Sequence, residues 1–172
     1  MDEPLDAFSI RLPVLIRPCV EADLPALDDF SRFVAHHVPV RELYEQHRSG
    51  RALILVAEVN GAPGGQLWID LERRRGELAG EIWAVYVLPG LRGQGIGARM
   101  VRAAEQALEA RGCRWALLGV EVDNPDARRL YERLGYTLAV TTPAPEAPEP
   151  SARGAVAQWV LRKALRAAGT QG

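Results

Sequence analysis

The sequence predicts a mixed α/β fold in which a mostly antiparallel sheet with one parallel strand pair is flanked by helices. Two hairpin signals favour antiparallel pairing: Asn60-Gly61 joins two apolar runs, and the charged loop 72–77 joins two more. The parallel pair is predicted from a helical pattern over 96–108 that separates two apolar strands, because such a crossover returns the chain in the same direction.

The first half of the chain predicts two helices followed by a strand meander. Residues 1–12 lack periodicity and are expected to form a loose arm. Asp23 is the expected N-cap of a first helix, whose apolar residues keep helical spacing, with Pro25 in its first turn. The expected elements are a strand at 14–17, a helix from residue 24, a helix at 40–47, and strands at 52–59, 64–71 and 81–88.

The second half predicts two strand–helix units and a closing pair of strands. Gly112 is expected to end the helix that begins near Ile96, and Asp123-Asn124-Pro125 is expected to cap the next one. The remaining expected elements are strands at 115–122, 136–140 and 156–161, with a proline-rich surface loop between the last two.

Composition limits the classes of function. A chain of 172 residues suits one domain, here 1–172 with its core at about 14–165, and a net charge of −1 argues against nucleic acid as the partner. Two isolated cysteines and three histidines without cysteine partners predict no metal. Since no apolar run approaches the length of a membrane span or of a signal peptide, we expect a cytoplasmic protein without a membrane partner.

The stretch 85–98 has the pattern of a strand end, a turn and a helix start. An apolar run ends at Pro89, and glycines at 93, 95 and 97 lead into the helix. Glycine lets the backbone approach a ligand closely, and the first N–H groups of a helix have no partner within the helix. With Arg92 beside them, these amides predict an anion-binding turn, suited to phosphate.

Two better-known phosphate-binding patterns do not fit this turn. The Walker pattern needs Gly-Lys-Ser/Thr, where this chain has Gly95-Ile96-Gly97. The dinucleotide pattern G-x-G-x-x-G fails because Ala98 stands at the position of the third glycine. The pattern that fits is Arg92-x-x-Gly95-x-Gly97.

A second motif, Asn124-x-x-Ala127-x-x-Leu130-Tyr131-x-x-x-Gly135-Tyr136, follows the strand at 115–122. With the glycine turn before it, it closely resembles the GNAT superfamily of acyl-CoA N-acyltransferases over roughly residues 14–165. The resemblance implies the mixed sheet described above and acetyl-CoA as co-substrate. It also implies an N-acetyltransferase that moves the acetyl group directly to a primary amine in a ternary complex.

The resemblance also implies which residues hold acetyl-CoA. Pantetheine is expected to pair with the strand end as an added strand would, and the diphosphate is expected to reach the glycine turn. Asn124 has two interpretations: the first is a helix cap, which alone explains it, and the second is a contact with the cofactor. The expected cofactor-binding residues are Val85, Tyr86, Val87, Arg92, Gly93, Gln94, Gly95, Ile96, Gly97 and Asn124.

Two residues are candidates for acid–base chemistry. The resemblance assigns Tyr131 as the general acid for the leaving thiolate, although its helical spacing equally suits core packing. Glu81 is the candidate base that takes the amine proton through water, although a glutamate at a hairpin end is often simply solvated. Neither cysteine lies in the motifs, which disfavours a thiol nucleophile.

The sequence leaves the acceptor open as a small-molecule or peptide amine. His36, His37 and Trp68 could line its pocket, although surface histidines and a packed tryptophan explain them as well. A non-catalytic acyl-CoA-binding regulatory domain is the alternative function, because it would need the glycine turn but neither Tyr131 nor Glu81. The sequence leaves the oligomeric state open, and the resemblance is compatible with a homodimer, which is common among similar proteins.

Overall fold

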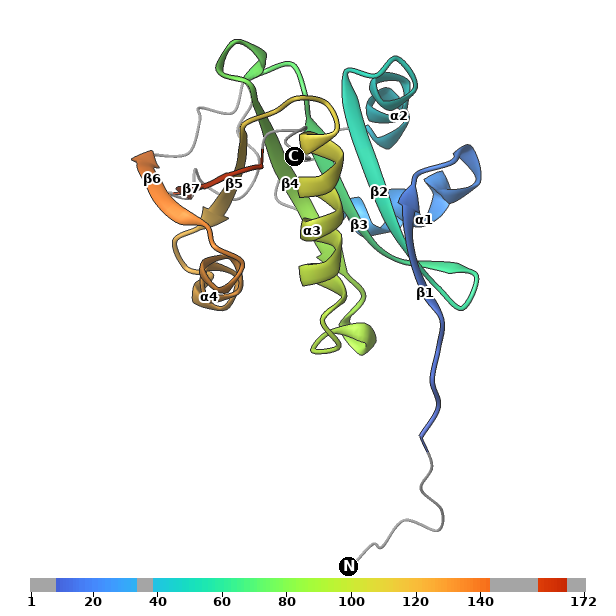
Figure 1. Ribbon diagram of the computed structural model, residues 1–172. Coiled ribbons are helices and arrows are strands. Elements are labelled where there is room, and N and C mark those ends of the chain that lie inside the picture. Colours follow the sequence, from blue (N-terminus) through green and yellow to red (C-terminus); the bar gives the residue numbers. More distant parts are fainter. Residues whose placement is uncertain (1–8, 34–38, 143–157, 167–172) are drawn as a thin grey trace, which may run out of the picture.

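The computed structural model describes residues 9–33, 39–142 and 158–166, which form a seven-stranded sheet with helices on both faces (Figure 1). The strand order is β1-β2-β3-β4-β5-β7-β6. Among the described strands only β4 and β5 pair in parallel, and the other neighbours are antiparallel. The strands are β1 Val14–Pro18, β2 Ala52–Val59, β3 Ala62–Asp70, β4 Ala79–Val87, β5 Trp115–Glu121, β6 Thr137–Thr142 and β7 Gln158–Ala164.

Four α-helices and three short 3-10 turns connect these strands. In Figure 1, α3 lies across one face of the sheet, and α1 and α2 lie at the β1–β3 side. None of the helices in the described ranges is long and apolar enough to cross a membrane. The helices are α1 Leu24–Ser31, α2 Val40–Arg48, α3 Ile96–Glu109 and α4 Pro125–Arg133, and the 3-10 turns are η1 Glu21–Asp23, η2 Arg75–Glu77 and η3 Pro89–Leu91.

Two apolar clusters hold the layers together. The first joins α3 and α4 to the sheet and includes Met100, Leu108 and Leu118. The second joins α1 and α2 to β2, β3 and β4 and includes Leu27 and Trp68. Neighbouring residues of a strand point to opposite faces. Side chains of β2, β3 and β4 therefore pack into the first cluster on one face and into the second cluster on the other. The sheet is therefore buried from both sides around β3 and β4.

The predicted fold class is confirmed. The Asn60-Gly61 hairpin, the strand at 52–59 and the parallel pair across α3 lie where the sequence indicates. The proline-rich loop predicted between the last two strands falls at 143–157, outside the described residues. His36 and His37 also lie outside the described residues.

The prediction that Asp23 caps α1 is wrong, because an ion pair uses the carboxylate instead. Asp23 makes no side-chain cap hydrogen bond to the helix. Its two oxygens accept from the Arg17 guanidinium at 2.7 and 2.9 Å, and one of them also accepts from the Val20 amide at 2.8 Å. Arg17 donates further to Glu58 at 2.7 Å. This network ties β1 to β2 and to the turn that precedes α1.

The environment of Asp23 changes the pKa of its carboxyl. Burial alone would raise that pKa, but the hydrogen bonds from Arg17 and Val20 outweigh burial and lower it. A carboxyl with a lowered folded-state pKa stabilises the fold above its unfolded-state pKa of about 3.9 and loses this effect as the pH falls through the folded-state value.

Asp23→Asn is therefore expected to lower the free energy of unfolding by about 2 kcal/mol at pH 7, because it removes a charge-assisted pair from a buried site. The difference from the wild type should shrink below pH ~4. Urea unfolding at pH 7 and pH 3 measures both effects. Asp29→Asn, at an exposed pair 3.5 Å from Arg32, is the matched control and should change little. An equal loss at both pH values would contradict the ionic origin.

Candidate functional site

The central feature of the site is the point where β4 and β5 separate. Their parallel pairing runs from Ala79 and Trp115 to Ile82 and Leu118 and ends there, although both strands continue. At the same level β4 carries one extra residue against β3. Trp68 pairs with Trp83 and Gln66 with Tyr86. An advance of three residues along β4 therefore lies opposite an advance of two residues along β3.

This extra residue makes a β-bulge at Ala84, whose φ of +51° is unusual for a residue with a side chain. A bulge bends its strand and increases the local twist. The bulge therefore accompanies the separation of β4 from β5, and the edge of β4 that faces β5 is left without a strand partner in the described ranges beyond Ile82.

The direction of the backbone groups on this edge follows from one hydrogen bond. Leu88 donates its N–H to the carbonyl of Gly64 on β3 at 2.9 Å. Successive N–H groups of a strand point to alternate edges, so those of Val87 and Val85 point away from β3, into the space between β4 and β5. Both side chains pack on the α3 cluster. The strand end thus offers hydrogen-bonding groups to an extended ligand, as the sequence suggested.

Tyr86 lies on the opposite face of the sheet. Its side chain is buried in the α1–α2 cluster, where its ring lies 5.2 Å from that of Phe30 and 5.6 Å from that of Phe33. Its N–H points toward β3 by the same alternation. Its contribution at this edge is therefore to hold the strand in place.

Arg92 bridges the strand end and the glycine turn. Its Nε donates to the carbonyl of Val87 at 2.9 Å, and its guanidinium lies 5.6 Å from the centre of the Tyr86 ring. The side chain is otherwise exposed. A positive charge is thereby fixed beside the gap and next to the start of α3.

The glycine turn has the conformation that its sequence requires. Gly93 and Gly95 have φ values of +76° and +77°, where a residue with a Cβ would be strained. The first hydrogen bond into α3 joins the Arg99 amide to the Gly95 carbonyl at 3.1 Å, so the amides of Ile96 and Gly97 precede the helical ladder. Gln94 is exposed within the turn, and the Ile96 side chain is buried. These amides and Arg92 fit a diphosphate.

Tyr131 lies on α4 and is buried in the cluster that also contains Met100 of α3. Burial raises the pKa of its hydroxyl to about 12, so the proton stays on the oxygen at neutral pH. The hydroxyl makes no hydrogen bond within the described ranges of the chain. Its ring contacts that of Tyr136 edge-on, at 6.2 Å. The Tyr131 side chain is therefore part of the core, and its protonated hydroxyl is not engaged in a hydrogen bond with any described residue.

Glu81 sits one residue before the strands separate. It lies on the face opposite α3, because its neighbours Gly80 and Ile82 face that helix. Its side chain is 26% exposed, and Oε1 lies 3.6 Å from the Arg73 guanidinium. Oε2 is buried and has no hydrogen-bond partner in the described ranges. A buried carboxylate oxygen without a partner is unusual and is suited to a water molecule or a substrate group.

Asn124 caps α4, as its first interpretation predicts. Its side-chain oxygen accepts from the Ala127 amide at 3.1 Å. The amide nitrogen of the same side chain is left for another partner.

Trp68 was a candidate for the acceptor pocket. Its side chain is 1% exposed, packs edge-on against Trp83 and belongs to the α1–α2 cluster.

Neither cysteine has the environment of a nucleophile. Burial, followed by the charge of Asp23, raises the pKa of the Cys19 thiol to about 12. Burial also raises the pKa of Cys113. A nucleophilic cysteine needs a lowered pKa.

The described ranges contain no cluster of three or more His, Cys, Asp and Glu side chains that could hold a metal ion.

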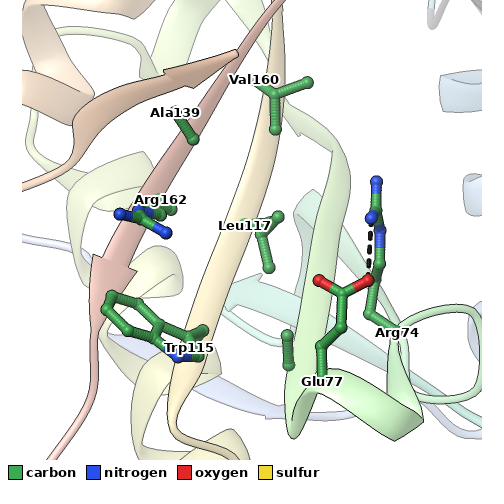
Figure 2. Close-up of a pocket in the computed structure, with 8 residues that line it drawn as sticks. Arg74, Glu77, Trp115, Leu117, Ala139, Val160 and Arg162 are labelled. Carbon is green, nitrogen blue, oxygen red and sulfur yellow. Dashed lines mark hydrogen bonds and ion pairs between the residues drawn. The ribbon is translucent and has the colours of Figure 1, made fainter.

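A pocket that sequence reasoning did not identify lies near Glu81. It has a volume of about 320 Å³, and its charged lining residues lie on opposite sides, with Arg74 and Glu77 on one and Arg162 on the other (Figure 2). Trp115 and Leu117 of β5 also line it. No motif marks these residues, because strands distant in the sequence bring them together. The strand at 115–122 is apolar over most of its length, so its sequence provides no signal of which face lines a pocket.

Comparisons with known proteins agree with this geometry. The model of the acetyltransferase (GNAT) family matches residues 23–136. Mycothiol acetyltransferase from Streptomyces avermitilis is 30% identical over 146 residues, which cover 77% of this chain and 46% of that protein. The chain therefore spans less than half of that relative.

Solved structures share the fold. The ribosomal-protein-S18-alanine N-acetyltransferase from Escherichia coli has a TM-score of 0.72 at 20% identity, covering 93% of this chain and 99% of that one. A phosphinothricin acetyltransferase from Sinorhizobium meliloti, in complex with acetyl-CoA, has a TM-score of 0.73 at 21% identity, covering 92% and 91%. These likenesses show the fold, and the family model covers most of the chain. The chain belongs to the acetyltransferase (GNAT) family.

The two interpretations of Asn124 can be separated by paired substitutions. Asn124→Ala should lower the free energy of unfolding by about 1 kcal/mol through loss of the cap, whereas Asn124→Asp keeps the accepting oxygen and should remain close to the wild type. Urea unfolding measures this difference. Equal stability of the two variants would contradict the capping role. Weaker acetyl-CoA binding by both variants would assign the amide nitrogen to the cofactor.

Proposed function

We propose that this chain is an N-acetyltransferase that moves the acetyl group of acetyl-CoA to a primary amine by direct attack in a ternary complex. One observation carries the proposal: the edge of β4 is freed from β5 directly beside a glycine turn whose amides begin α3. An extended pantetheine fits the first feature and a diphosphate the second. Family membership supports the same conclusion.

In this proposal the backbone of Val85 and Val87 pairs with pantetheine, with Tyr86 fixing the strand between them. The Val85 N–H polarises the thioester carbonyl, as an oxyanion hole does. Asn124 adds a contact from the start of α4. The diphosphate is held by the turn and its arginine, namely Arg92, Gly93, Gln94, Gly95, Ile96 and Gly97.

The chemistry requires a neutral amine and a stabilised leaving thiolate. Glu81 accepts the amine proton through a water molecule at its unpartnered Oε2. The neutral amine nitrogen then bonds to the thioester carbon and the carbon–sulfur bond breaks. The second proton that the nitrogen loses passes to solvent water, from which Tyr131 is reprotonated after the transfer. Tyr131 donates its hydroxyl proton toward the departing sulfur, and its high pKa keeps that proton in place beforehand. No covalent enzyme intermediate is needed, which agrees with the inert cysteines.

The acceptor in this proposal is a small-molecule or peptide amine. The names of similar proteins span both kinds, since one relative is a mycothiol acetyltransferase and one structural neighbour is a ribosomal-protein-S18-alanine N-acetyltransferase. A single catalytic domain, a cytoplasmic location and a homodimer also belong to the proposal.

Calorimetric titration with acetyl-CoA tests the cofactor site. The wild type should bind saturably, and Arg92→Glu should weaken binding at least tenfold, because it places a negative charge against the diphosphate and frees the Val87 carbonyl. Arg114→Glu is the matched control, because Arg114 is exposed and directly precedes β5, and this variant should bind as the wild type does. A folded wild type that does not bind acetyl-CoA would refute the proposal.

Tyr131→Phe tests turnover separately from binding. We expect kcat to fall by about 10² or more, a typical loss for a general acid, while the dissociation constant for acetyl-CoA changes less than threefold. Stability should change by less than about 0.5 kcal/mol, since the hydroxyl makes no hydrogen bond in the described ranges of the chain.

The pH dependence gives a second measurement for the same residue. Because the pKa of the Tyr131 hydroxyl is about 12, it stays protonated between pH 7 and pH 10, and its deprotonation should cause no loss of rate in this range. Unchanged kcat in Tyr131→Phe would contradict the acid role. A wild type that binds acetyl-CoA but acetylates no amine in a broad panel would instead support the regulatory binding domain.

A further inference from the structure

We propose that the pocket beside Glu81 receives the acceptor, and that Arg162 selects amines that also carry a carboxylate. This inference rests on the proposed acetyl transfer and adds a substrate class to it. Figure 2 shows the pocket between the Arg162 and Trp115 side chains on one side and the Arg74–Glu77 ion pair on the other.

The pocket opens on the face of the sheet opposite α3. Ala116 and Leu118 belong to the α3 cluster, so Trp115 and Leu117 must point the other way. Leu161 of β7 also belongs to that cluster, which places Val160 and Arg162 on the pocket side. On this face α1 and α2 cover β2, β3 and β4. The floor over β5 and β7 has no α-helix on it in the described ranges.

A single row of paired residues connects the pocket to the point of reaction. Glu81 pairs with Leu117, and Leu117 pairs with Arg162, so the three side chains share one face. Two strand spacings separate Glu81 from Arg162, about 10 Å between their backbones. Since β4 and β5 diverge just beyond Glu81, an amine entering from this face reaches the gap from the side opposite α3.

Among the described residues that line the pocket, one cation is left without a carboxylate partner. Arg74 donates to Glu77 at 3.0 Å, so these two charges neutralise each other. Arg162 lies with its guanidinium 4.8 Å from the centre of the Trp115 ring and has no ion-pair partner in the described ranges. Two arginines against one glutamate give the lining a net charge of +1. A guanidinium held on an aromatic ring is well placed to bind a carboxylate through two hydrogen bonds.

The floor between the two charged ends is apolar. Leu117 and Val160 line it, together with the small side chains of Ala79 and Ala139. A short aliphatic chain fits such a floor better than a second charge does. The pocket therefore fits a molecule with a carboxylate at Arg162 and a hydrocarbon stem over the floor, whose amine extends past Leu117 toward Glu81, the neighbour of Leu117 on β4.

Matched amines test this class directly. L-lysine and cadaverine differ only by the carboxylate, as do L-ornithine and putrescine, and 6-aminohexanoate and pentylamine. Release of the coenzyme A thiol from acetyl-CoA gives kcat/KM for each amine. For at least one pair, the wild type should favour the carboxylate-bearing member at least tenfold, the effect of one charge-assisted contact.

Arg162→Gln should reduce that ratio at least tenfold, mainly through KM, and Arg162→Lys should restore some of it. Arg102→Gln, an exposed arginine on α3 and hence on the other face, is the matched control and should keep the wild-type ratio.

The inference is overturned if the carboxylate-free amines are equal or better in every pair, if no pair is acetylated, or if Arg162→Gln leaves the ratio unchanged. Turnover of the broad amine panel separates these failures from failure of the acetyltransferase itself, because a protein that acetylates other amines keeps the proposed function and loses only the substrate class. Absence of acetyl-CoA binding would remove both proposals.

Discussion

The separation of β4 from β5 is the constraint on which the rest of the site depends. Pairing ends at Ile82 and Leu118, and the bulge at Ala84 bends β4 just beyond that point. A continuous parallel pair would use the edge groups of β4 internally. Because the strands diverge, the edge groups of β4 beyond Ile82 have no strand partner in the described ranges and are available to a ligand.

Close packing keeps this gap in a fixed position. A Cβ added to Gly80 would lie 2.1 Å from Leu108 of α3, and one added to Gly65 would lie 2.7 Å from the Tyr86 carbonyl. Helix and strand therefore meet more closely around β4 than any larger residue would allow. Since well-packed interiors deform little, the strand end and the start of α3 are held in a constant relation.

Three arginines illustrate how the surroundings of a side chain decide its role. Arg17 is satisfied by Asp23 and Glu58 and serves the fold. Arg92 is held on the Val87 carbonyl, which fixes its charge beside the gap while leaving it exposed. Arg162 rests on Trp115 with no carboxylate partner in the described ranges, so its charge is available to a ligand. Composition alone treats the three as equivalent.

The sequence by itself determined the fold class, the glycine turn and the cap at Asn124, because these depend on local patterns: alternation, helical spacing, and the backbone freedom of glycine. The local pattern predicted that Asp23 caps α1, but its carboxylate accepts hydrogen bonds from Arg17 on β1 instead. Only the tertiary structure revealed the bulge at Ala84 and the pocket at Arg162. Both depend on pairing between strands, and register is decided by the whole sheet and not by neighbouring residues.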